Sequence, residues 1–161
     1  MRNLLQKRHC YRLPYLYRCL RIPGLSITQI GNLASLRIGI KNASKEQSEN
    51  VLEASALLSG AHIHHKIADN IIAAIWRKYI LNCAYNITTA RYNRTIGQLR
   101  EDPETAAQYE TLVRESWLVS EAAGAGVPET SINEIIDQFY HKLDPASTSS
   151  LQKRYLGRTP Q

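Results

Sequence analysis

The sequence predicts a mainly α-helical domain, a bundle of helices preceded by a short β segment. Apolar residues recur with helical spacing in five stretches between residues 45 and 157, and caps, prolines or glycines bound most of them. Clear alternation of apolar and polar residues is confined to a short stretch before residue 41. The chain has 161 residues, 43% of them hydrophobic and 21% charged, so it can bury the core that such a bundle needs.

The β segment is expected between residues 25 and 40, as two short strands around Gly31. The second strand alternates apolar residues with polar or small ones, its apolar positions being Leu36, Ile38 and Ile40. Another short extended piece is expected at residues 62–67, directly before the longest helix.

The first helix is expected at residues 45–59 and should end at Gly60, since glycine often follows a helix. Its inner side would be formed by Val51, Leu52, Ala54, Leu57 and Leu58. The second helix, residues 70–90, would be capped by Asp69. It is apolar on almost every side, and such a helix is normally buried.

Three more helices are expected after residue 101. Asp102 and Pro103 provide a cap and a first-turn proline for the third helix, which would end at Gly124. Its inner face would consist of Ala106, Tyr109, Leu112, Val113 and Trp117. The fourth helix would begin with a capping box of Ser131 and Glu134. It would bury Ile132, Ile135, Ile136, Phe139 and Leu143. The last helix is expected within residues 147–157.

Three polar residues interrupt the second helix at steps of four: Lys78, Asn82 and Asn86. Each step advances about 6 Å along a helix and only about 40° around it, so the side chains form one row. The row continues the stripe of Ile71 and Ile75 and would point towards the core. Either it lines a cleft, where the lysine could hold an anion or deliver a proton, or it is structural. In the structural interpretation Lys78 reaches solvent and the asparagines bridge helices.

Positive charge is concentrated at the start of the chain. Residues 1–45 hold nine Lys or Arg and no acid, whereas the remainder holds eleven bases and fourteen acids. The body is therefore not expected to bind nucleic acid, and no apolar run reaches the roughly 18 residues of a membrane span. Residues 1–21 could be a transit peptide, an arm for phosphate or membrane surfaces, or the remnant of an upstream domain. Three cysteines without a C-x-x-C pair favour a reducing cytoplasm.

Other candidate sites are weaker. His62 and His64 would share a strand face, but two histidines without a nearby carboxylate make a poor metal site, so no bound metal is expected. Gly124 and Gly126 end a helix rather than cradle a phosphate. No nucleophile elbow surrounds the serines near the end of the chain.

The polar row carries a resemblance to a known family. The segment IWRKYILNCAYNITTA resembles the W-x-K-x-x-x-N-x-x-x-N-x-x-T-A segment of the C-terminal domain of ketopantoate reductase, 2-dehydropantoate 2-reductase. Three further pieces occur in that family's order: RIPGLSITQIGNLASLRIGI, RESWLVSEAAGAGVP and STSSLQKRYLGRT. Together the matching pieces cover about residues 22 to 161.

The resemblance implies a helical domain of the 6-phosphogluconate-dehydrogenase-like kind, preceded by a short Rossmann remnant. Residues 1–44 would be the remnant and residues 45–161 the helical domain, truncated at its end. The family reduces a 2-oxo acid, ketopantoate, with NADPH in the pantothenate pathway. By this resemblance Lys78 would be the general acid that protonates the keto oxygen. The substrate would be bound by Asn82, Asn86 and a serine, Ser149 or Ser150.

The chain also departs from the family pattern. It lacks the G-x-G-x-x-G nucleotide fingerprint. Ile96 stands where the family often has an asparagine, and Lys153 or Arg154 where it has an aspartate. Gln161 stands where a glutamate would contact the nucleotide. The resemblance therefore implies a truncated reductase that is weak or inactive alone. The alternative is a non-catalytic helical interaction module, and a homodimer is compatible with both.

Overall fold

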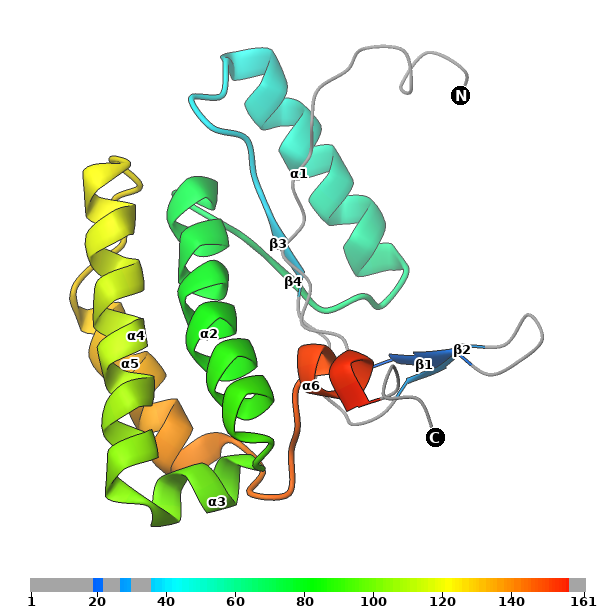
Figure 1. The fold of residues 1–161 in the computed structure, drawn as a ribbon. Helices are drawn as coiled ribbons and strands as arrows, with labels where there is room; N and C mark the ends of the chain where they lie inside the picture. The colour runs from blue at the N-terminus through cyan, green and yellow to red at the C-terminus, as the bar shows by residue number, and fades with distance from the viewer. Residues whose placement is uncertain (1–18, 22–26, 30–35, 157–161) are drawn as a thin grey trace. The chain divides into compact units, whose positions relative to one another are not determined.

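The computed structural model describes residues 19–21, 27–29 and 36–156. The chain separates into two compact units, Met1–Ile75 and Trp76–Gln161. Figure 1 shows the order of the elements along the chain. Helices dominate the described residues, so the predicted mainly α-helical fold class is confirmed.

In the described part of the first unit, four short strands form two separate pairs. β1 (Cys19–Arg21) pairs antiparallel with β2 (Ile27–Gln29), and β3 (Leu36–Ile38) pairs in parallel with β4 (His65–Ile67). α1 (Lys45–Gly60) connects the parallel strands, which need a long crossover. β3, α1 and β4 therefore form a βαβ unit, the building block of nucleotide-binding α/β domains. The division into domains at residue 44 stays a prediction.

The strands predicted around Gly31 exist as β2 and β3, but each pairs with a different partner. Gly31 itself lies outside the described residues. Leu36 and Ile38 are buried while Arg37 is exposed, which confirms the predicted alternation. Periodicity identifies a strand and its buried face, but it carries no information on which strand lies beside it, so the partners of β2 and β3 do not follow from the sequence.

α1 begins with a complete capping box. The Ser44 hydroxyl accepts a hydrogen bond from the Gln47 N–H at 3.2 Å, and the Gln47 side chain accepts one from the Ser44 N–H at 2.9 Å. Val51 is buried, but Leu52 and Leu57 are 61% and 77% exposed. The predicted inner side is too wide, because the described sheet beside α1 is only two strands across.

The described elements of the second unit are all helical. α2 (Ile71–Tyr92) crosses the boundary between the units, and five helical segments follow it: α3 (Ile96–Glu101), α4 (Pro103–Ala122), α5 (Thr130–Asp137), the π-helical turn η1 (Gln138–Lys142) and α6 (Ser150–Leu156). α3 is only six residues long and is not predicted from the sequence. No helix in the part of the chain that the structure describes is long and apolar enough to cross a membrane.

The core of the second unit is centred on two stacked rings. Tyr109 of α4 and Phe139 of η1 have ring centroids 4.0 Å apart and nearly parallel planes. Around them lie side chains that are less than 2% exposed, among them Ile80, Ile96, Leu99, Val113 and Ile135. Trp117 is only half-buried, and its Nε1 donates to the carbonyl of the buried Val127 at 3.0 Å. Most of the predicted inner faces of α4 and α5 are thus confirmed.

Two predicted caps are wrong. Asn70 takes the place of Asp69 as the cap of α2, because its side-chain oxygen accepts from the Ala73 N–H at 3.1 Å. α5 has no side-chain cap, and Ser131 is buried within its first turn. The Pro128 carbonyl already accepts from the Ser131 N–H at 2.9 Å, so the chain turns before the position that the capping-box pattern indicates.

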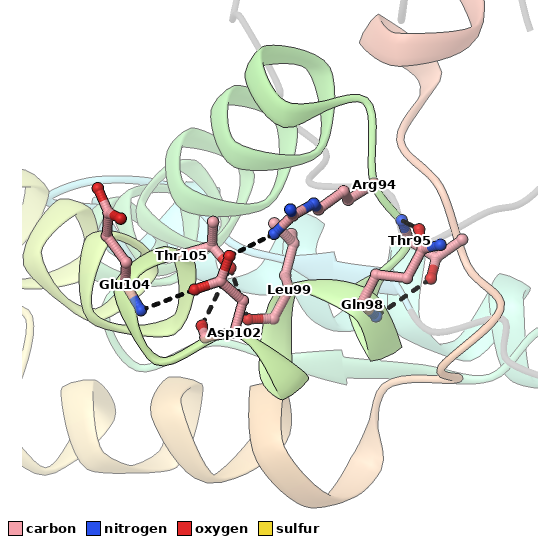
Figure 2. A network of polar contacts seen from close by, with 7 residues as sticks. All are labelled: Arg94, Thr95, Gln98, Leu99, Asp102, Glu104 and Thr105. Carbon is pink, nitrogen blue, oxygen red and sulfur yellow. Dashed lines mark hydrogen bonds and ion pairs between the residues drawn. The ribbon is translucent and has the colours of Figure 1, made fainter.

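A polar network forms the junction between α3 and α4 (Figure 2). Thr95 and Gln98 make a capping box at the start of α3. Asp102 ends α3 and caps α4, accepting from the Glu104 N–H at 3.0 Å, which confirms the predicted cap. Its second carboxylate oxygen is hydrogen-bonded to Arg94, and this contact lowers the pKa of Asp102 below its ordinary value.

Candidate functional site

A polar stripe runs along one side of α2. Successive residues of an α-helix are rotated by about 100°, so five polar residues fall within about 80° of one another. They are Lys78, Asn82, Asn86, Thr89 and, directly after the helix, Asn93. The predicted row of three is therefore the first part of a longer stripe that reaches the end of the helix.

The first part of the stripe, Lys78, Asn82 and Asn86, lies on the side of α2 opposite to its core residues, whereas Thr89 is itself fully buried. Ile80, Ala84 and Thr88 each follow a stripe residue by two positions, about 200° around the helix, and are fully buried. The first three stripe residues are only half-buried. Moreover, Tyr79 is 52% exposed, so α2 is not buried on every side. The prediction that the polar row points towards the core is wrong.

The Lys78 ammonium is partly withdrawn from water. Burial lowers the pKa of Lys78 below its ordinary value, because the charged form loses hydration. Among the described residues, neither Lys78 nor the amides of Asn82 and Asn86 has a side-chain hydrogen-bond partner. A half-buried cation beside two unpaired amides can bind an anionic ligand and can release a proton to it.

Ser149 attaches the start of α6 to the stripe. Its hydroxyl oxygen accepts from the Gln152 N–H at 3.0 Å, which makes Ser149 the cap of α6. It also lies 2.7 Å from the hydroxyl oxygen of Thr89, which in turn donates to the Tyr85 carbonyl at 2.7 Å. Ser149 is 1% exposed, whereas Ser150 is exposed. Of the two serines predicted for the substrate, only Ser150 is open to solvent.

A second contact joins α6 to the end of the stripe. Gln152 Nε2 donates to Asn93 Oδ1 at 3.0 Å. Gln152 is 4% exposed, and its Oε1 has no hydrogen-bond partner in the described structure. Asn93 has a left-handed φ of 49°, a conformation that asparagine adopts more readily than most residues, and it terminates α2. The site thus brings together α2 and the first turn of α6.

Three of these residues are not among the predicted site residues: Thr89, Asn93 and Gln152. Helical spacing carries the signal that could have found them. Thr89 and Asn93 follow Asn86 by three and seven residues, and Gln152 follows Ser149 by three, so each shares a helix face with a predicted site residue. What spacing does not reveal is that these two faces meet.

The remaining candidates lie elsewhere. Ile96, which replaces a family asparagine, is fully buried in the core. Gln161, predicted to contact the nucleotide, is outside the described residues. His62 has a left-handed φ of 54° and precedes β4, so it shares no strand face with His64. Within the described ranges, no three His, Cys, Asp or Glu side chains are grouped to hold a metal ion.

A cavity of about 570 Å³ opens beside α4, away from the stripe. Arg100 and Arg114 contribute positive charge to its lining, and Glu110 offsets part of it. The Glu110 carboxylate is held by the Tyr140 hydroxyl, which donates to it at 2.8 Å. Arg114 also lies 4.0 Å from the Glu110 carboxylate, and Arg100 donates to the Leu143 carbonyl at 2.6 Å. The side chains at the start of the stripe make no such contacts with the described residues.

Three solved structures resemble the fold. The PanE/ApbA family ketopantoate reductase of Ralstonia eutropha JMP134 has a TM-score of 0.72 and 21% identity, covering 92% of this chain and 47% of that one. A dimeric ketopantoate reductase from Staphylococcus aureus has a TM-score of 0.69 and 21% identity, covering 93% and 49%. A complex of D-mandelate dehydrogenase with NADH has a TM-score of 0.75 and 16% identity, covering 92% and 49%. This chain therefore spans about half the length of these proteins.

The family comparison rests on the sequence of the helical part. Residues 70–158 match the family described as "Ketopantoate reductase PanE/ApbA C terminal". The match covers more than half of the chain and contains the whole polar stripe, the cap of α6 and Gln152. It confirms the resemblance drawn from the Lys78 segment. The chain therefore belongs to the ketopantoate reductase family, of which it carries the helical C-terminal domain.

Proposed function

We propose that this chain is a 2-dehydropantoate 2-reductase-like oxidoreductase chain whose polar stripe binds a 2-oxo acid such as ketopantoate. One observation carries the proposal: within the family match, the half-buried Lys78 stands beside the amides of Asn82 and Asn86, which have no hydrogen-bond partner among the described residues. A carboxylate next to a keto group supplies the negative charge and the acceptor oxygens that these groups need.

Reduction of a 2-oxo acid adds a hydride to the keto carbon and a proton to the keto oxygen, giving a 2-hydroxy acid. Lys78 would donate this proton, and its charge would stabilise the developing alkoxide. The lowered pKa of Lys78 makes the ammonium a stronger acid, closer to what proton transfer near neutral pH requires. Asn82 and Asn86 would donate hydrogen bonds to the carboxylate and the hydroxyl of the ligand. Ser150 would add another donor, since Ser149 is engaged as the cap of α6.

NADPH is the hydride source that membership of the family implies. The β3–α1–β4 unit is the kind of building block found in nucleotide-binding domains, but the chain has no G-x-G-x-x-G fingerprint. We therefore assign no NADPH contact to any residue. Because the chain spans about half the length of its solved relatives, we propose that it is weak or inactive as a reductase by itself. A reducing cytoplasm remains its expected setting.

Thermal unfolding of the purified chain with ketopantoate tests this function. A ligand at one hundred times its Kd stabilises a protein by about 2.7 kcal/mol, which raises the Tm by several degrees. We expect this rise in the wild type and in the control Lys153→Ala, whose lysine is exposed on α6. We expect no rise in Lys78→Ala. A cooperative transition that ketopantoate does not move would refute substrate binding. A further rise in the Tm on addition of NADPH would show that the chain also binds the nucleotide.

The alternative is a helical interaction module. Apolar side chains remain exposed on α2 and α4, the largest being Tyr79, Ile87, Leu118 and Val119. Such side chains favour association, and one solved relative is described as dimeric. Light scattering distinguishes the two: a homodimer without any ketopantoate effect would favour the interaction module.

A further inference from the structure

Two hydrogen-bonded contacts attach α6 to the polar stripe, one helical turn apart. Thr89 and Asn93 are four residues apart on the α2 side, and their partners Ser149 and Gln152 are three apart on the α6 side. These four residues form a clasp between the two helices. Both contacts lie within the second unit.

We propose that the clasp is a positioning device for the substrate site, with Gln152 and Asn93 as positioning residues. The proposal rests on the function proposed above. The clasp fixes the first turn of α6, which carries Ser150, beside the C-terminal end of the stripe. Asn82 and Asn86 precede this end on the same stripe. Neither Gln152 nor Asn93 touches the substrate in this scheme.

The chemistry of Gln152 argues against packing as its only role. The side chain is 4% exposed, and its Oε1 is buried without a hydrogen-bond partner among the described residues. A buried polar atom without a partner is destabilising. An apolar side chain of the same length would fill the space without this cost. What the glutamine alone provides is the Nε2 hydrogen bond to Asn93.

The geometry explains why a second contact is needed. The hydroxyls of Thr89 and Ser149 each rotate about a single bond, so their contact fixes one point but no direction. The planar amides of Asn93 and Gln152 fix a second point one turn further along. Two points define the direction of α6 against α2. At seven residues, α6 is too short to be stable without such tertiary contacts.

The test is Gln152→Met in the full 161-residue chain, with ketopantoate affinity measured by titration calorimetry and the Tm of the free chain measured alongside. Methionine keeps the length and removes both the donor and the unpaired oxygen. Asn93 is exposed, so water replaces its lost partner, and the Tm should change little. The Kd for ketopantoate should rise about tenfold, the upper range for the loss of one hydrogen bond.

Asn93→Gly removes the same hydrogen bond from the other side while keeping the left-handed turn. It should weaken ketopantoate binding to the same extent, and the double variant should be no weaker than either single variant. Gln108→Met, at an exposed position of α4, is the matched control and should bind ketopantoate like the wild type.

Wild-type affinity in Gln152→Met and Asn93→Gly would overturn the proposal. So would a large fall in the Tm of Gln152→Met, which would make the residue a part of the core. If the wild type binds no ketopantoate, the proposed function fails, and amide hydrogen exchange of the free chain then decides on the clasp. The Lys153 N–H bonds to the Ser149 carbonyl at 3.2 Å. Faster exchange there in Gln152→Met, with α4 unchanged, would support the clasp, and unchanged exchange would overturn it.

Discussion

Tyr109 brings an unsatisfied polar group into the core of the second unit. Its ring stacks on Phe139, but its hydroxyl is buried with no hydrogen-bond partner among the described residues. Burial also raises the pKa of Tyr109 above its ordinary value. Tyr140 offers the contrast, because its hydroxyl donates to the Glu110 carboxylate at 2.8 Å. Two tyrosines that both contact the ring of Phe139 therefore predict opposite effects when the hydroxyl is removed.

Tyr109→Phe should raise the free energy of unfolding by about 1 kcal/mol, since it removes an unpaired buried group. Tyr140→Phe should lower it by about 0.5 to 1.5 kcal/mol, since it removes a hydrogen bond.

The pKa of Tyr109 is raised in the folded state, so above about pH 10 the unfolded chain loses this proton first and the wild type loses stability. The Tyr109→Phe variant should lose less of its free energy of unfolding over the same rise in pH. Urea denaturation at neutral and alkaline pH measures both effects, and equal losses in wild type and variant would contradict the second.

At the scale of elements, the junction of α3 and α4 depends on one carboxylate with two roles. Asp102 caps α4 through Oδ1, and its Oδ2 is paired with Arg94 (Figure 2). The hydrogen bond from Arg94 is the main reason that the pKa of Asp102 is lowered. Asparagine would keep the capping oxygen and lose the charge, so the two roles can be separated.

Asp102→Asn should lower the free energy of unfolding at neutral pH. A carboxyl whose pKa is lowered in the folded state contributes stability above its ordinary pKa of about 3.9, and this contribution is lost as the pH falls through the lowered value. The difference between wild type and variant should therefore vanish in acid. Arg94→Gln should cause a similar loss that also vanishes in acid. The double variant should be little less stable than either single variant. A difference that stays constant from neutral to acid pH would show that the ion pair is not its source.

α2 shows why a helix can be predicted while its orientation is not. Its apolar residues surround it, so periodicity offers no preferred inner face, and only Ile71 and Ile75 indicate a direction for the stripe. Ile71 belongs to the first unit, where it lies 3.2 Å from the place that a Cβ on Gly39 would take. The later turns belong to the second unit and bury Ile80 and Ala84. The buried residues of the first turn and of the later turns of α2 thus lie on different faces of the helix.

At the scale of the whole molecule, the second unit has a core of its own. We expect a fragment of residues 68–161, which keeps Asn70 as the cap of α2, to retain its helical circular dichroism and to unfold cooperatively. The stacked pair of Tyr109 and Phe139 and the fully buried Ile135 supply the apolar burial. Phe139→Ala should lower the free energy of unfolding by about 3 to 5 kcal/mol and so abolish the cooperative transition of the fragment. If the unsubstituted fragment shows no cooperative transition, the second unit does not fold without the first.

The sequence by itself determined the helical class, the starts of α1 and α4, the row of Lys78, Asn82 and Asn86, and the family. Caps, prolines and helical spacing act over three or four residues, so they can be read without knowing the fold. Only the tertiary structure decided the partner of each strand, the inner face of α2, and the engagement of Ser149 as a cap. It alone revealed the clasp, whose contacts join residues 59 and 60 positions apart. Contacts of that range depend on how the helices pack, and local spacing carries no record of it.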